Sequence, residues 1–398
     1  MSKSGKRESI IKYKLLYTAI ILLVYMLGRS LPIYGIDMAA YTGKAMDAGE
    51  LLEQTISGDR HSLFALGISP YMIASILVQM VTALRRAGSK EKISPLRTNR
   101  VMLALTFTFA VFQAATQVQE LPFRPMWLPI ELVKLVAAAE LVAGVAMILW
   151  LSARNKKYGI GGQTALIYIN IMDGILTNLT RHELRELAAP LCVAVAALII
   201  MNVMESGEKR IPVQRISIHN IYSDKNYLAI KLNPVGVMPV MFATAFLMLP
   251  RFLLTGLGYL FPESAGILWW QENLEMDRPL GVAAYLLTLY LLTMVFALIF
   301  INPGEMAEQL LKSGDSLLDI HAGRETRKYL SREVRRLSFL SATVMSLCLC
   351  VPMLLQLRGV ERTLAMFPAS VMMLTGIWYN LKEEFVAVKG YDAYRPFI

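Results

Sequence analysis

The chain has 398 residues, of which 55% are hydrophobic, and its mean hydropathy is +0.47. Its apolar residues gather in runs long enough for an α-helix to cross the hydrocarbon core of a bilayer, which excludes a water-soluble globular fold. The formal net charge of +10 does not indicate nucleic-acid binding, because basic loops beside a membrane are the usual result of topology and attraction to anionic lipids.

Ten membrane-spanning helices are predicted, at approximately 15–33, 68–84, 101–119, 131–151, 163–180, 187–204, 234–254, 280–301, 337–356 and 363–380. With a cytoplasmic amino terminus, most of the 40 Lys and Arg residues fall in the amino terminus, the even-numbered loops and the carboxyl tail. Basic residues concentrate in cytoplasmic segments. The sequence therefore predicts an all-α polytopic membrane protein with both termini in the cytoplasm.

The second predicted span is interrupted. Gly67 and Pro70 break the apolar segment between Ser62 and Met80. Hydrocarbon cannot satisfy the amides and carbonyls that such a break leaves unpaired, so the break predicts a place where protein or a water-filled path surrounds the backbone. Taken alone it is also compatible with ordinary packing, because Gly and Pro are common in membrane helices.

Two acidic residues lie inside predicted spans, Glu140 in the fourth and Asp173 in the fifth. Such residues act as relay or coordination groups in ion-coupled transporters, which keeps that class open. A polar contact between helices is the other interpretation. Cys192, Cys348 and Cys350 all lie within spans, and the four histidines are scattered over separate loops. This pattern indicates neither a disulfide framework nor a metal site.

Ten spans divide into two sets of five, residues 1–183 and 184–398, which would have opposite orientations in the membrane. The second span of the second set begins with Asn233-Pro-Val-Gly-Val-Met-Pro239, so it is also interrupted near its start. Paired Gly/Pro-interrupted spans at equivalent positions indicate where an inverted-repeat transport protein handles its substrate. We therefore expect spans two and seven to face each other.

Two cytoplasmic segments, 205–231 and 302–336, are longer than the topology requires. The second is predicted to form a helix from Pro303 to a stop at Gly314, followed by an exposed basic helix from Arg324 to Arg336 ahead of span nine. No Gly-rich phosphate-binding loop occurs, so neither enzymatic activity nor a cofactor is expected. Any work would be driven by an ion gradient or by a partner docked on these loops.

Four stretches, SLFALGISPYMIASILVQ, EKRIPVQ, NPVGVMPVMFA and INPGEMAEQLLKSG, resemble the SecY family, whose members are the central subunits of the bacterial protein-conducting channel. The resemblance runs from about Lys14 to Ala387 in one register. It implies an hourglass pore between two inverted halves, a plug before span two, and a lateral gate between spans two and seven. The implied partners are a SecA-type motor, small SecE-like and SecG-like or accessory membrane subunits, a preprotein and membrane lipids.

Carried over by position, the resemblance assigns four sets of residues. The pore constriction would contain Met72, Ile76, Thr164, Tyr168, Met241 and Met373. The plug would cover about 57–66, with Ser57, Gly58, Asp59, Ser62, Leu63, Phe64 and Leu66. The lateral gate would include Pro70, Ser75, Gln79, Gln113, Asn233 and Pro239. The motor-binding loops would present Lys209, Arg210, His321, Arg324, Arg327 and Lys328.

The chain departs from the family pattern in three respects. Thr164 and Tyr168 stand where the family has aliphatic side chains, His321 stands where it has an arginine involved in coupling to the motor, and the loops are short. These features resemble the accessory SecY of Gram-positive bacteria, which works with its own SecA to export serine-rich glycosylated adhesins across the plasma membrane. The alternatives are a housekeeping SecY for general secretion and membrane insertion, an ion-coupled small-solute transporter, and a membrane scaffold.

Overall fold

The computed structural model describes residues 4–37, 61–88, 94–124, 127, 129–181, 184–215, 227–261, 264–318 and 320–394. Long helices occupy the positions of the ten predicted spans. In the first half they are α1 (Ser4–Ser30), α4 (Ser69–Gly88), α5 (Pro95–Glu120), α6 (Ile130–Tyr158) and α7 (Gly162–Arg181). In the second half they are α8 (Leu184–Ser206), α9 (Met238–Leu260), α11 (Pro279–Ile301), α13 (Arg324–Leu357) and α14 (Arg362–Tyr394).

Seven helices within the described residues are long and apolar enough to cross a membrane: α1, α5, α6, α8, α11, α13 and α14. The three others, α4, α7 and α9, contact one another or α14 in the middle of the molecule. A helix that neighbouring helices shield from lipid has less need of a continuous apolar surface. Their central position agrees with contacts to other helices on several sides.

Two shorter helices complete the helical part, α10 (Ala265–Asn273) between α9 and α11, and α12 (Pro303–Ser313) after α11. Helix α12 begins with Pro303 and ends at Gly314, whose φ of +71° suits glycine, so this prediction is confirmed. The predicted basic helix does begin at Arg324, but it does not end at Arg336. That segment continues into span nine as α13, because Leu330, Val334 and Leu337 extend one buried stripe across the expected boundary.

A small antiparallel sheet, which the sequence did not predict, joins the two long segments 205–231 and 302–336. Its strands are β1 (Glu208–Arg215), β2 (Tyr227–Lys231) and β3 (Asp315–Leu317), in the order β2-β1-β3. Glu208 pairs with Lys231, and Val213 pairs with Leu317. The alternation of buried Ile211 and half-buried Val213 with exposed neighbours is the signal that would have found the strand.

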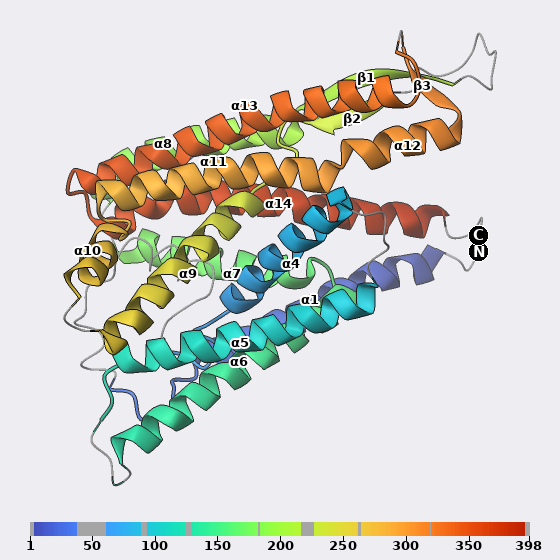
Figure 1. The fold of residues 1–398 in the computed structure, drawn as a ribbon. Helices are drawn as coiled ribbons and strands as arrows, with labels where there is room; N and C mark the ends of the chain where they lie inside the picture. Colours follow the sequence, from blue (N-terminus) through green and yellow to red (C-terminus); the bar gives the residue numbers. More distant parts are fainter. Residues whose placement is uncertain are drawn as a thin grey trace.

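Figure 1 shows the helices of the two halves as two groups, with α4 and α9 lying between them. The sheet, α12, the start of α1 and the end of α14 lie at one end of the molecule, and α10 lies at the other. The halves meet along two seams. Helix α9 contacts α4 and α5 on one side, and α14 contacts α7 and α1 on the other.

The contacts within the first half recur within the second. In the first half the pairs are α1–α6, α1–α7, α4–α5, α5–α6 and α6–α7. In the second half they are α8–α13, α8–α14, α9–α11, α11–α13 and α13–α14. Taken in chain order, α1, α4, α5, α6 and α7 correspond to α8, α9, α11, α13 and α14. Each contact of the first half then has its counterpart in the second. The two halves therefore share one packing arrangement.

Candidate functional site

Helices α4, α7, α9 and α14 bring four of the expected constriction residues into one apolar cluster. Met72, Met241 and Met373 are 3%, 6% and 0% exposed, and Tyr168 is half-buried against them. Phe64, from the segment before α4, belongs to the same cluster. Three of these four side chains are methionines, whose flexible side chains adapt to neighbours of different shapes.

The two other expected constriction residues lie elsewhere. Ile76, one turn beyond Met72 on α4, is buried in a second cluster that includes the sheet residue Ile211 and Phe296 of α11. Thr164 lies in the first turn of α7, where its Oγ1 donates a hydrogen bond to the carbonyl of Gly161 at 2.5 Å. The geometry thus groups Met72, Tyr168, Met241 and Met373 and separates these two from them.

Residues 61–67, here called the plug segment, form a chain of tight turns packed inside the first half. The expected plug residues Ser57, Gly58 and Asp59 lie outside the described residues. Leu63 donates its backbone N–H to the carbonyl of Leu31 at 2.9 Å, and Ser62 forms a bridge with Pro32. These contacts tie the segment to the chain that follows α1.

The side chains of the plug segment anchor it on two sides. Phe64 is 1% exposed and stacks on Tyr25 of α1, with ring centroids 5.6 Å apart. Leu66 is buried in a separate cluster between α5 and α6. Gly28 and Gly144 lie directly against the segment, because a Cβ on either would fall within 2.1 Å of Phe64 or Leu63. Two glycines therefore make the room in which the segment sits.

The expected gate residues of the first half lie on α4 and α5. Pro70 is buried in the first turn of α4, and Ser75 donates its hydroxyl to the carbonyl of Met72 at 2.9 Å. Gln113 of α5 is 1% exposed, and neither end of its amide has a hydrogen-bond partner among the described residues. The Oε1 atom of Gln79 is likewise buried without a partner there. Buried amide atoms without a partner are costly.

Replacing Gln113 with leucine is expected to stabilise the folded protein. A buried amide without a partner costs about 1–3 kcal/mol, and a leucine of similar volume avoids that cost. The apparent Tm of the purified protein should therefore rise. The exposed Gln119 on the same helix gives a matched control, since Gln119→Leu should change the Tm little. A lower Tm for Gln113→Leu would contradict the expectation.

In the second half, Asn233 connects three elements just before α9. Its Nδ2 donates to Oε1 of Glu205 in α8 at 2.7 Å, and its Oδ1 accepts from the hydroxyl of Ser341 in α13 at 2.8 Å. All three side chains are at most 3% exposed. Gly236 follows with a φ of +68°, and Pro239 is buried in the first turn of α9. The segment at the break before α9 is thus held in place by the hydrogen bonds of Asn233 to α8 and α13.

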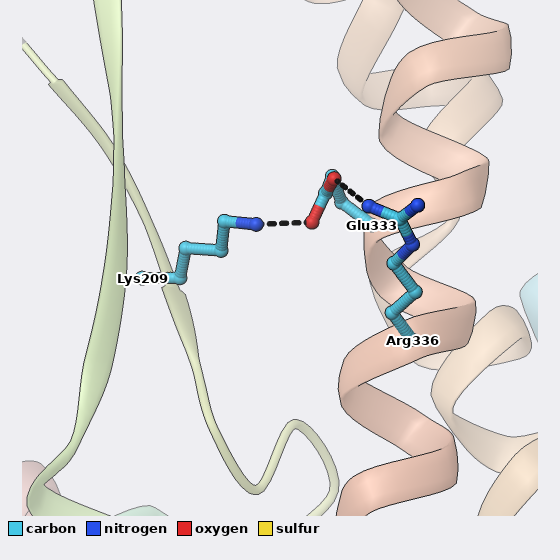
Figure 2. Close-up of polar contacts among 3 residues, drawn as sticks. All are labelled: Lys209, Glu333 and Arg336. Carbon is cyan, nitrogen blue, oxygen red and sulfur yellow. Dashed lines mark hydrogen bonds and ion pairs between the residues drawn. The ribbon is translucent and has the colours of Figure 1, made fainter.

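Near the sheet, the expected docking residues have different surroundings. Lys209 of β1 forms an ion pair with Glu333 of α13, which also contacts Arg336 at 3.2 Å (Figure 2). Arg210 lies over the ring of Tyr227, 4.7 Å from its centroid. Sequence reasoning missed Glu333, because a glutamate among basic residues gives no sign that it will be buried. It holds the sheet to α13.

The remaining docking residues lie on the surface. His321 is exposed, and its backbone carbonyl accepts a hydrogen bond from the Thr326 hydroxyl at 2.9 Å. One face of α13 lines a depression of about 440 Å³ with Arg324, Arg327, Lys328, Ser331, Arg332 and Arg335. This face forms a positively charged surface suited to an acidic partner.

Glu140 and Asp173, the two acidic residues that made an ion-coupled transporter a possible interpretation, both form structural contacts. Glu140 accepts a hydrogen bond from the backbone N–H of Tyr34 at 2.9 Å. Asp173 forms an ion pair with Arg29 at 2.9 Å, and Arg29 also donates to Asn170. These contacts link α6 and α7 to α1 and the segment after it. The geometry thus favours the interpretation of both groups as polar contacts between helices.

The family model of SecY matches residues 62–381, which covers most of the chain. The chain belongs to the SecY family. As a SecY protein it is a subunit of a protein-conducting channel rather than an enzyme, and a multi-pass protein of the plasma membrane.

Two relatives bear the name accessory Sec system protein translocase subunit SecY2. The protein from Leuconostoc gelidum subsp. gasicomitatum is 30% identical, and the match covers 94% of both chains. The protein from Streptococcus sanguinis is also 30% identical, over 100% of both chains.

Among solved structures, one described as a protein conducting channel has a TM-score of 0.71 at 17% identity, covering 96% of this chain and 93% of the other. Sec61 in a canine ribosome-channel complex has a TM-score of 0.66 at 16% identity, with the same coverage. These structures share the fold of this SecY protein.

Proposed function

We propose that this SecY protein is the pore-forming subunit of an accessory Sec system, in which a SecA-type ATPase drives unfolded preproteins across the plasma membrane. The observation that carries the proposal is the convergence of α4, α7, α9 and α14 on one apolar cluster that also contains Phe64 of the plug segment. The names of the relatives support the accessory system over housekeeping secretion.

The proposed architecture has ten spans in two inverted halves, residues 1–183 and 184–398, with both termini in the cytoplasm. The recurrence of the same helix contacts in both halves supports the inverted repeat. The start of α1, the end of α14 and the basic sheet region lie at one end of the molecule, which supports a common cytoplasmic side (Figure 1).

The constriction would work through the chemistry of its side chains. Met72, Met241 and Met373 offer no strong hydrogen bonds, so they contact any passing sequence without specificity and exclude ions by dewetting when the pore is empty. The hydroxyl of Tyr168 adds one polar group at this level. Translocation would displace the plug segment, and separation of α4 from α9 would open a path to lipid for a hydrophobic signal segment.

The partners follow from the surfaces. The basic face of α13 and Arg210 would bind the motor, which carries the ATPase activity that this chain lacks. Small SecE-like and SecG-like or accessory membrane subunits would pack on the lipid-facing side of the spans. The cargo would be a serine-rich glycosylated surface adhesin. The housekeeping alternative predicts general preproteins in its place.

Crosslinking to a stalled substrate tests the proposal. In a variant without Cys192, Cys348 and Cys350, single cysteines at Tyr168 and Met241 are expected to crosslink to a preprotein arrested in proteoliposomes with the cognate SecA and ATP. A cysteine at Val195, which is 50% exposed on α8, is the control and should react with lipid-borne probes only. Reaction of Tyr168 and Met241 only with lipid probes would refute the pore, and equal transport of general preproteins would refute the accessory assignment.

A further inference from the structure

Helix α10 presents an unusual surface at the end of the molecule opposite the sheet (Figure 1). None of its nine residues is buried. Three adjacent large apolar residues, Leu268, Trp269 and Trp270, are 51%, 51% and 48% exposed. Polar residues Gln271 to Asn273 follow them directly. The helix thus combines an uncovered apolar segment with a polar end.

Specific contacts fasten α10 to the last turns of α9. The amide of Gln271 donates a hydrogen bond to the backbone carbonyl of Leu254 at 2.9 Å. The same amide lies against Gly258, where a Cβ would come within 2.9 Å of it. The rings of Trp269 and Trp270 meet edge to face, 5.1 Å apart. These contacts make α10 an attachment to the end of α9 with a defined orientation.

The position of α10 in the chain places its apolar residues next to helices that can span the membrane. The helix joins α9 to α11, and α11 is one of the helices able to span the membrane. Leu253 and Leu257 near the end of α9, and Phe261 just after it, are 49%, 41% and 58% exposed, so α10 follows a segment that also exposes large apolar side chains. Tryptophan side chains favour the boundary between hydrocarbon and headgroups, where the ring is apolar and the indole N–H remains hydrated.

We propose that α10 binds the outer leaflet of the membrane. Leu268, Trp269 and Trp270 insert at the level of the headgroups, while Glu272, paired with Arg278, stays at the aqueous side. Through Gln271, the bound helix holds the outer end of α9. This last consequence rests on the proposed role of α9 as a gate helix: any displacement of α9 must move α10 within the lipid interface, so the lipid restrains gate opening.

Fluorescence quenching by brominated lipids tests the membrane contact. The chain has five tryptophans, so Trp127→Phe, Trp150→Phe and Trp378→Phe leave only the two of α10. In proteoliposomes, their emission is expected to be quenched more by lipids brominated near the headgroup than by lipids brominated near the chain ends. No quenching by either lipid would overturn the proposal, and stronger quenching by the deep bromines would show instead that α10 lies within the hydrocarbon.

A transport measurement tests the restraint on α9. Removing both aromatic side chains with Trp269→Ala and Trp270→Ala is expected to raise the initial rate of translocation several-fold, and Trp127→Ala, at a position 87% exposed, is the matched control. An unchanged or lower rate would overturn the restraint. If the unaltered channel moved no substrate, the proposed function would fail, while the quenching result would still decide the membrane contact.

Discussion

Replacing Gly28 with alanine is expected to loosen the plug segment and to raise the ion permeability of the resting channel several-fold. A Cβ on Gly28 would lie 2.1 Å from Cε2 of Phe64, far inside contact distance. Phe64 is 1% exposed and stacked on Tyr25, so the ring has little space in which to retreat. Overpacking of this kind costs about 1–3 kcal/mol, and displacement of the segment relieves the cost.

Gly144→Ala tests the other side of the same segment. Here the added Cβ would lie 2.0 Å from the carbonyl oxygen of Leu63, a backbone atom that no change of rotamer moves. Ion flux from proteoliposomes without substrate measures both variants. Gly174→Ala is the control, because a Cβ on Gly174 meets nothing within 4 Å. Adding Phe64→Leu to Gly28→Ala should partly lower the ion flux again, because the smaller side chain makes room for the new Cβ. An ion flux of Gly28→Ala equal to that of the original protein would contradict the predicted clash with Phe64.

Asn233→Ala is expected to produce the largest loss of stability among the variants considered. It leaves the carboxylate of Glu205 without its 2.7 Å donor and the hydroxyl of Ser341 without its 2.8 Å acceptor, both in a buried setting. Each buried polar group that loses its partner costs about 1–3 kcal/mol, and more when it is charged. The apparent Tm of the purified protein should therefore fall markedly.

Two further variants make this prediction sharper. Asn233→Asp keeps an acceptor for Ser341 but removes the donor to Glu205 and places a second carboxylate beside it, so the Tm should fall at least as far as in Asn233→Ala. Asn273→Ala is the matched control, because Asn273 is bonded only locally, to the carbonyl of Trp269 on its own helix. An Asn233→Ala protein as stable as the original would contradict the proposed contribution of the contacts with Glu205 and Ser341.

Local sequence patterns predicted the helices well, because each span must bury its own backbone hydrogen bonds and cover them with apolar side chains. The positions of α4 and α9 followed from their Gly and Pro residues, and the end of α12 followed from Gly314. The sequence did not show that the basic helix from Arg324 and span nine are one helix. The buried stripe through Leu330 and Val334 carries α13 across Arg336 without a break.

The candidate site was accessible to sequence reasoning only in part. Family position placed Met72, Tyr168, Met241 and Met373 together, and the structure does bring them into one cluster. Ile76 belongs to the cluster that contains the sheet residues, and Thr164 is bonded locally in the first turn of α7. Glu333 and Gly28 were not foreseen, because the importance of each depends on one distant neighbour.

The sequence by itself determined that this protein crosses a membrane several times, and its motifs identified the SecY family. Hydropathy and short motifs are local properties, so they can be read along the chain. Only the tertiary structure decided how the two broken helices meet, that Asn233 joins Glu205 to Ser341, and that Gly28 and Gly144 make room for the plug segment. Those features are contacts between residues far apart in the chain, and they exist only once packing has fixed which side chains become neighbours.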